Sequence, residues 1–175
     1  MNETDKLQVV VMGVAGCGKT TVGRLLAERL GAAFADADGL HSPESVAKMA
    51  AGRPLTDEDR YPWLERVGQL LGRETEGQLV MACSALRRDY RDRLRSASGR
   101  PLFFVHLTGD ADLLAHRMQE RDSHFMPVSL LRSQLDTLEP LDIDEDGATV
   151  SITAHPSEIV TEAELYLRLQ ATSSS

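Results

Sequence analysis

The stretch Gly13-Val14-Ala15-Gly16-Cys17-Gly18-Lys19-Thr20 decides the fold. It has the spacing G-x-x-x-x-G-K-[ST], in which glycines let backbone N–H groups turn inward around phosphate oxygens. The apolar run before it, residues 7–12, predicts a buried strand, and residues 19–30 after it have helical spacing that stops at Gly31. A strand, this loop and a helix in that order favour a phosphate-binding loop over a chance match in a glycine-rich turn.

The loop predicts a nucleoside triphosphate site. All eight of its residues are candidates for ATP binding, since the helix dipole adds favourable potential where the loop meets the helix. Lys19 is expected to reach the β- and γ-phosphates, and the Thr20 hydroxyl is expected to bind Mg²⁺.

The rest of the chain continues the alternation of strands and helices. Four more strands are expected at residues 33–35, 79–83, 102–107 and 148–153. Helices are expected at 44–51, 58–76, 85–95, 110–121, 128–138 and 157–169. This order predicts an α/β fold with one parallel sheet covered by helices on both faces, in a single domain over residues 1–175. Ligands of such sheets bind at the carboxyl ends of the strands.

Composition narrows the class of protein. The chain has 175 residues, a formal net charge of −8, 42% hydrophobic residues and 26% charged residues, which is ordinary for a globular enzyme. A broad nucleic-acid surface needs a positive face, so we expect no nucleic-acid partner. No apolar run approaches the roughly 20 residues of a membrane helix, and because the N-terminus is polar we expect no signal peptide there.

Two cysteines, Cys17 and Cys83, make no disulfide framework and fit a reducing cytosol, so a cytoplasmic location is expected. The small polar tail, residues 171–175, is expected to fray.

Two carboxylates follow the second expected strand. Asp36 and Asp38 are two residues apart, so in an extended segment both point the same way. Phosphoryl transfer to a hydroxyl needs a proton acceptor and a group that holds the metal shell. We assign Asp38 to the acceptor hydroxyl as candidate base and Asp36 to a Mg²⁺-bound water. The alternative is a solvated turn or a helix cap.

Arginines supply the remaining candidates. Arg117 and Arg121 lie four residues apart on one helical face, within a possible lid over residues 117–135 that would close on the transferring charge. The alternative is a solvated basic face.

Arg60 could clamp a carboxylate, or pair with its own acidic neighbours Asp57-Glu58-Asp59. Arg87 is a second candidate for carboxylate capture, and His41 could touch substrate, although a lone histidine is weak evidence.

Over residues 10–140 the chain resembles the gluconokinase family, which is related to the shikimate kinases. The stretches that carry the resemblance are Met12-Gly13-Val14 with the phosphate-binding loop, Ala35-Asp36-Ala37-Asp38-Gly39-Leu40-His41, Pro62-Trp63-Leu64, Cys83-Ser84-Ala85-Leu86-Arg87-Arg88 with Tyr90-Arg91-Asp92, His124-Phe125-Met126-Pro127, Ser133-Gln134-Leu135 and Thr137-Leu138-Glu139-Pro140.

The resemblance implies ATP- and Mg²⁺-dependent phosphorylation of D-gluconate at its 6-hydroxyl, a homodimer, and a P-loop sheet in the order 2-3-1-4-5. It implies that Asp38 and Arg60, in a substrate-binding segment over residues 38–64, meet the acceptor. It also places Arg117 near adenine and Arg121 near the phosphates. The chain departs from the family at Ser42, where a proline is usual after the histidine, and at Ser45, where an asparagine is usual.

Three other functions remain to be weighed. A shikimate kinase or nucleotide kinase would share everything except the acceptor pocket. A GTPase-like switch would need the Asn-Lys-x-Asp guanine motif, and the chain has no asparagine after Asn2. An inactive kinase-like binding protein is disfavoured by the retained Lys19, Thr20, Asp36, Asp38 and Arg121.

Overall fold

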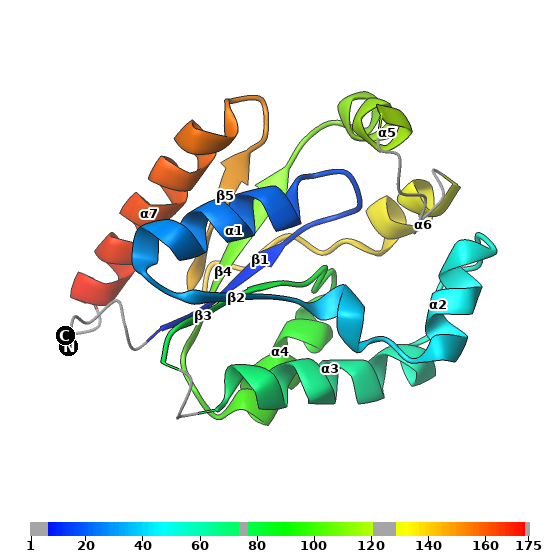
Figure 1. Cartoon of the computed structure of the whole chain (residues 1–175), viewed down its shortest axis with the longest axis horizontal. Helices are drawn as coiled ribbons and strands as arrows, with labels where there is room; N and C mark the ends of the chain where they lie inside the picture. Colours follow the sequence, from blue (N-terminus) through cyan, green and yellow to red (C-terminus); the bar gives the residue numbers. More distant parts are fainter. Residues whose placement is uncertain (1–6, 74–76, 121–128, 174–175) are drawn as a thin grey trace.

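The structure is a computed structural model that describes residues 7–73, 77–120 and 129–173. Within these residues one five-stranded parallel sheet has the order β2-β3-β1-β4-β5 (Figure 1). This confirms the expected fold class and strand order. The strands are β1 (Gln8–Met12), β2 (Ala33–Asp36), β3 (Leu79–Ala82), β4 (Leu102–Thr108) and β5 (Gly147–Ser151).

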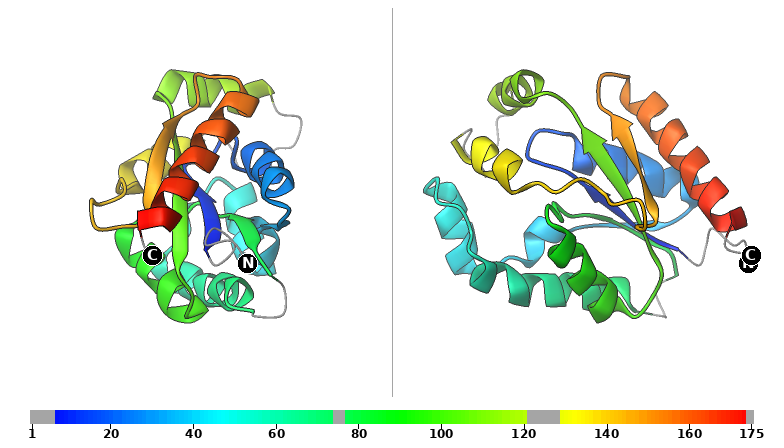
Figure 2. Two further views of the ribbon diagram at one scale, coloured as in Figure 1. Left: turned by 90° about the vertical axis from the view of Figure 1, so that its left-hand side faces the viewer. Right: turned by 180° about the vertical axis from the view of Figure 1, so that it is seen from behind.

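Helices cover both faces of the sheet because alternate strand residues point to opposite sides. In β1, Val9 and Val11 join the core under α1 (Lys19–Leu30) and α7 (Pro156–Ser173). Val10 and Met12 join a second core under α3 (Asp57–Leu71) and α4 (Arg88–Ser98). The two further views in Figure 2 show these three layers from the side and from behind.

The remaining helices stand beyond the carboxyl ends of the strands. They are the 3₁₀ turn η2 (Ala37–Leu40), α2 (Pro43–Ala50), α5 (Ala111–Glu120) and α6 (Ser129–Thr137). Figure 1 shows α2, α5 and α6 grouped at this edge, where a parallel α/β sheet binds its ligands.

Several expected boundaries were wrong. Helix α3 starts after Thr56, whose side chain and that of Asp59 form a capping box, and ends at Leu71 rather than residue 76. Helix α4 starts at Arg88 rather than residue 85, because Ala85 has a φ of 44°, which is left-handed and not helical. Helix α7 continues to Ser173, since Ala171 is buried in the core where a frayed tail was expected.

Helices α3 and α4 pack at very close range. A Cβ atom built on Gly68 of α3 would lie 2.4 Å from the Cβ of Ala97 in α4. Only glycine permits this approach, which brings the last turn of α3 against the last turn of α4. No helix within the described residues is both long and apolar enough to span a bilayer.

Candidate active site

The phosphate-binding loop is shaped by its backbone. Gly13, Gly16 and Gly18 have φ values of 148°, 84° and 93°, which glycine adopts readily. The loop is tied to the next strand by the N–H of Gly13, which donates to the Ser84 carbonyl at 3.2 Å. Gly18 is the N-cap of α1 and makes no side-chain cap, so the first N–H groups of this helix can serve an anion.

Lys19 and Thr20 connect the loop to its surroundings. The Lys19 ammonium donates to the carbonyls of Gly13 at 3.0 Å and Val14 at 3.2 Å. The Thr20 hydroxyl donates to Asp36 Oδ2 at 2.9 Å, while Asp36 Oδ1 accepts the N–H of Asp38 at 3.0 Å. Asp36 therefore links the loop helix to the segment that carries Asp38.

The two aspartates reach the site differently from the expectation. Asp36 ends β2, but Asp38 lies in the turn η2, so the two carboxylates are not alternate residues of one extended segment. Both still line the same cavity. The prediction that the two share one extended segment is wrong, and their roles as base and as holder of a metal-bound water stay predictions.

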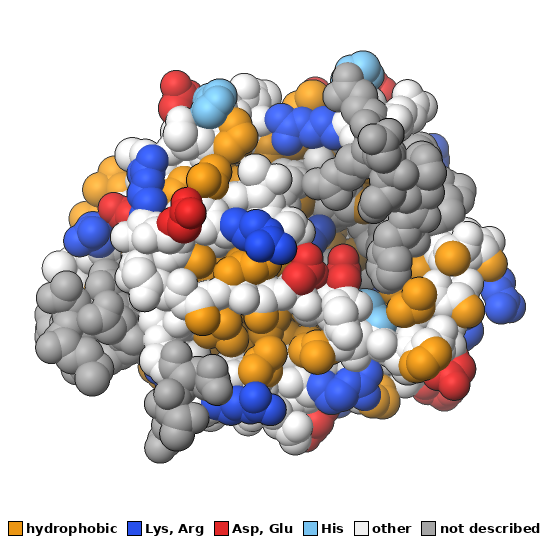
Figure 3. Space-filling view, viewed as in Figure 1, with side chains coloured by type: hydrophobic (Ala, Val, Ile, Leu, Met, Phe, Trp, Pro, Cys, Tyr) orange, Lys and Arg blue, Asp and Glu red, His pale blue; other side chains and the backbone are white. Residues whose placement is uncertain are grey.

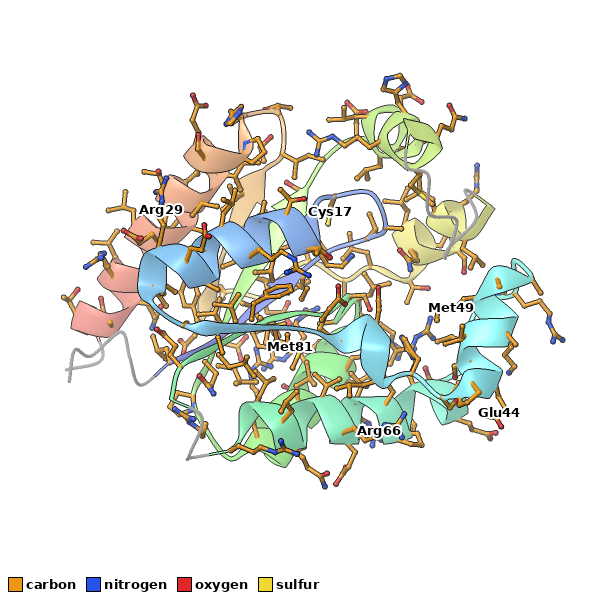
Figure 4. All side chains as sticks on the ribbon, in the orientation of Figure 1. Cys17, Arg29, Glu44, Met49, Arg66 and Met81 are labelled. Carbon is orange, nitrogen blue, oxygen red and sulfur yellow. The ribbon has the colours of Figure 1, made fainter. Side chains whose placement is uncertain are left out.

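A cavity of about 290 Å³ opens on one side of the loop. It is lined by Lys19 and Thr20 and by acceptor-side residues from several elements: Asp36, Asp38, His41, Met49, Leu55, Arg60, Trp63, Ser84, Leu86, Ser133 and Gln134. Figure 3 shows the surface hollowed here, with acidic, basic and histidine side chains near one another. In Figure 4, Met49 lies on the side of α2 that faces the sheet.

His41 is held as a neutral imidazole. Its ring stacks on Trp63 at 4.1 Å between centroids, and the Trp63 indole N–H donates to the Ala37 carbonyl at 2.7 Å. Burial, and then the nearby charges of Arg60 and Arg66, lowers the pKa of His41 to about 4. At neutral pH this side chain can therefore both donate and accept a hydrogen bond in the cavity.

Arg60 does not pair with its acidic neighbours. Its Nη1 donates to the Leu55 carbonyl at 2.6 Å and to the Tyr90 hydroxyl at 3.1 Å. Asp59 instead binds Lys48 of α2 at 2.7 Å, and this hydrogen bond is the main cause that lowers the Asp59 pKa to about 2. The ion-pair alternative for Arg60 is thus not what the described residues show, and the guanidinium lines the cavity.

A second cavity, of about 260 Å³, lies on the other side of the loop. It is lined by Gly16, Cys17, Gly18, Thr21, Val22, Arg117, Pro156 and Ile159. The Arg117 guanidinium is fixed here by its bond to the Ile152 carbonyl at 2.9 Å. Gly16 and Gly18 line both cavities, so the loop separates two binding spaces.

Comparisons with known proteins agree with this arrangement. A family model described as shikimate kinase matches residues 15–144. The gluconokinase of Gluconobacter oxydans (strain 621H) is 47% identical over 88% of this chain and 87% of its own. The thermosensitive gluconokinase of Escherichia coli (strain K12) is 42% identical over 87% of this chain and 82% of its own. The crystal structure of a gluconokinase from Sinorhizobium meliloti 1021 has a TM-score of 0.88 at 44% identity, covering 97% and 95% of the two chains.

The chain belongs to the gluconokinase family. It is a P-loop kinase of the wider group that the shikimate kinase model describes. The predicted family, fold class and class of enzyme are confirmed.

In this kinase Arg87 is the predicted acceptor residue that stays outside the cavity lining. It pairs with Asp89 at 3.0 Å and with Asp57 at 3.8 Å, and Asp89 is the main cause that raises its pKa. Its guanidinium lies over the Tyr90 ring, 5.4 Å from the centroid. A direct contact between Arg87 and substrate stays a prediction. Arg121 and the stretch 124–127 lie outside the described residues.

The departures from the family pattern have a local explanation. The Ser42 hydroxyl caps α2 by accepting the N–H of Ser45 at 3.1 Å, and Pro43 occupies the first turn of that helix. Ser45 is buried beneath this cap. The serines begin a helix here, and neither lines the cavity.

Sequence reasoning assigned no role to two further contributors. Gln134 of α6 accepts the N–H of Ala15 through Oε1 at 2.6 Å, which fixes α6 on the loop. The turn after β3 brings Ser84 and Leu86 to the cavity, and Arg91 donates to the Ala85 carbonyl between them at 2.9 Å. Both stretches contributed to the family resemblance, but contacts across 119 residues leave no local pattern in the chain.

Proposed function

We propose that the chain catalyses ATP-dependent phosphorylation of D-gluconate to 6-phospho-D-gluconate, in gluconate catabolism. One observation carries the proposal: two cavities meet at Gly16 and Gly18 of the phosphate-binding loop, and the larger one contains a carboxylate and a guanidinium. A triphosphate on the loop would have its nucleoside in the smaller cavity, near Arg117. Its terminal phosphate would face the larger one.

The acceptor fits the larger cavity by its charge and its hydroxyl groups. Gluconate has a carboxylate at one end and a primary hydroxyl at the other. Arg60 is suited to bind the carboxylate, and neutral His41 can hydrogen-bond a hydroxyl group. Asp38 would accept the proton of the 6-hydroxyl as that oxygen attacks the γ-phosphorus, and the P–O bond to ADP breaks in line.

On the donor side, the loop N–H groups and Lys19 would hold the β- and γ-phosphates. The Thr20 hydroxyl is a hard oxygen ligand that suits Mg²⁺. Asp36, whose Oδ2 lies 2.9 Å from the Thr20 hydroxyl oxygen, would hold a water of the metal shell. When bound there, Mg²⁺ supplies charge neutralisation to the phosphates. Arg117 belongs to the ATP site in this proposal, and we retain Arg121 as a catalytic and ATP-binding residue.

The proposal includes a homodimer in the cytoplasm. Leu165, Tyr166 and Leu169 expose apolar side chains on α7, which is surface that a second copy can bury. Both cysteines are free thiols, as in proteins of reducing compartments. Light scattering after size-exclusion chromatography tests the dimer.

A coupled ADP-release assay tests the reaction. Purified protein is given Mg-ATP with D-gluconate, its stereoisomers, shikimate or nucleoside monophosphates. We expect ADP release that depends on D-gluconate and yields a product phosphorylated at the 6-hydroxyl. A clear preference for shikimate or a nucleotide over gluconate would reject the proposal.

A further inference from the structure

The guanidinium of Arg60 has two edges with different partners. Its Nη1 makes both of its hydrogen bonds, to the Leu55 carbonyl at 2.6 Å and to the Tyr90 hydroxyl at 3.1 Å. Its Nε and Nη2 form no hydrogen bond to the residues that the structure describes. These two nitrogens make the edge with which arginine binds a carboxylate through two parallel hydrogen bonds. The contacts of Nη1 therefore determine which way this edge faces.

Tyr90 is placed to control that orientation. Its side chain is only 2% exposed, and its hydroxyl donates to Asp57 Oδ1 at 2.5 Å. Because that one proton is given to Asp57, the oxygen can only accept from Arg60. The Arg60 guanidinium also lies over the Tyr90 ring, 5.3 Å from the centroid. The carboxylate, the phenol and the guanidinium thus form a directed chain that ends in the cavity.

The supports of this chain are rigid. Asp57 is the first residue of α3, directly after the N-cap Thr56, and Tyr90 lies in the first turn of α4. The same two helices are also in close contact in their last turns, at Gly68 and Ala97. Burial, and then the hydrogen bond to Asp57, raises the pKa of Tyr90 to about 12, so the phenol keeps its proton throughout the range in which a kinase works.

We propose that Tyr90, oriented by Asp57, positions Arg60 so that its Nε–Nη2 edge binds the carboxylate of the acceptor. Tyr90 is then a positioning residue that determines specificity without touching substrate. This inference rests on the proposed function, since it specifies how the same cavity recognises an acid.

The test compares two single-hydroxyl deletions, Tyr90→Phe and Tyr61→Phe. Tyr61 is the matched control because its hydroxyl also donates to Asp57, at 3.3 Å to Oδ2, and makes no hydrogen bond to Arg60, whose hydrogen bonds within the described residues go to Leu55 and Tyr90. We expect Tyr90→Phe to raise the KM for gluconate roughly tenfold, as for a lost hydrogen bond to a charged group. The KM for ATP and kcat should stay within about twofold, and Tyr61→Phe should leave all three constants near wild type.

A change in the KM for gluconate alone would show that Tyr90 positions Arg60, whereas a joint loss of kcat and ATP affinity would show that Tyr90 only stabilises the fold. If Tyr90 only supported the packing of α3 on α4, the variant would lose kcat and ATP affinity together, and the inference would be overturned. An unchanged KM for gluconate would overturn it as well. Should Tyr90→Phe fold poorly, Asp57→Asn serves in its place, with a smaller rise in the same KM expected.

The activity of the wild-type enzyme tests the proposed function separately from the role of Tyr90. Absence of gluconate-dependent turnover in wild type would reject the proposed function. The Tyr90 inference would then be tested on whichever carboxylic acid of the substrate panel is phosphorylated, with the same pair of variants.

Discussion

The two cavities on either side of the phosphate-binding loop are built in different ways. The donor side is shaped by main chain: three glycines with positive φ and a helix start without a side-chain cap. The acceptor side is shaped by side chains, and these are held by other side chains. Trp63 supports His41, Tyr90 and Asp57 support Arg60, and Arg91 supports the turn that presents Ser84 and Leu86.

This difference shows where each kind of specificity resides. A main-chain cradle recognises phosphate, which every triphosphate has, and tolerates changes of most side chains that point away from it. The acceptor cavity is lined by side chains from η2, α2, α3, α6 and the turn after β3, so the choice of phosphate acceptor depends on all of these elements. Changes on the acceptor side should therefore alter turnover of gluconate while ATP still binds.

Asp38→Asn should give the largest effect and separate the two sides most clearly. The amide cannot take the proton of the 6-hydroxyl, so kcat should fall by about 10²- to 10⁴-fold, the usual contribution of a positioned general base. Binding of a fluorescent ATP analogue should stay within about twofold of wild type, because nothing on the donor side changes. Steady-state kinetics with a titration of the analogue measures both, and near-normal turnover would remove Asp38 from the role of base.

Gly16→Ala tests the main-chain cradle directly. A Cβ atom there would lie 2.8 Å from the Leu114 carbonyl and 3.0 Å from Met118 Cγ, on a backbone with a φ of 84°. The loop must shift, so we expect ATP affinity to fall at least about tenfold, equivalent to roughly 1.4 kcal/mol. Isothermal titration calorimetry measures the affinity.

Cys17→Ala is the control for that variant, one position along the loop. Its thiol is buried under the loop, so its removal should cost some stability and leave ATP affinity within about threefold. Equal losses of affinity in the two variants would show that loop side chains matter as much as loop backbone.

The contrast between locally formed and distantly supported structure also explains which helix ends could be predicted from the sequence. Helix α1 was predicted with its observed bounds, Lys19–Leu30, because both ends carry a local signal at Gly18 and Gly31. The start of α4 was misplaced because the left-handed turn at Ala85 is held by distant parts of the chain. The N–H of Gly13 donates to the Ser84 carbonyl at 3.2 Å, and the N–H of Glu139 donates to the Leu86 carbonyl at 2.7 Å. Local patterns reveal elements whose ends are fixed locally, and miss ends that are fixed by tertiary contacts.

On the acceptor side the sequence identified side chains but not what supports them. Asp38, His41 and Arg60 were predicted, and all three line the cavity. The chain from Asp57 through Tyr90 to Arg60 joins residues 33 and 30 positions apart, and Gln134 meets Ala15 across 119. Such contacts follow from the packing of α3, α4 and α6, which no spacing in the sequence indicates.

Acid should destabilise the fold through two histidines, the half-buried His41 on the acceptor side and the buried His106 in β4. Burial, followed by nearby arginines, lowers the pKa of His41 and of His106 in β4 to about 4, from an ordinary value of 6.5. Between these two values the unfolded chain binds protons that the folded chain does not, so the free energy of unfolding falls as pH falls from 6.5 toward 4. For each histidine the slope is at most about 1.4 kcal/mol per pH unit.

Urea denaturation between pH 7.5 and 4.5 measures that slope. His106→Leu should flatten it, whereas removal of His155, an exposed histidine, should not. A wild-type free energy of unfolding that is constant over this range would show that these two imidazoles take up protons in the folded protein.

The smallest effect is expected where the acceptor side has a strained main chain of its own. Ala85→Gly relieves the left-handed φ of 44°, a gain of about 1–2 kcal/mol. It also loses about 0.4–1 kcal/mol to the greater entropy of the unfolded chain and about 0.8 kcal/mol from a buried methyl group. These contributions nearly cancel, and the Arg91 guanidinium still holds the carbonyl of residue 85.

We therefore expect the free energy of unfolding of Ala85→Gly to change by less than about 1 kcal/mol in urea denaturation. The KM for gluconate should not change. A large rise in that KM would mean that the Ala85 backbone itself shapes the acceptor cavity, as glycines shape the donor side.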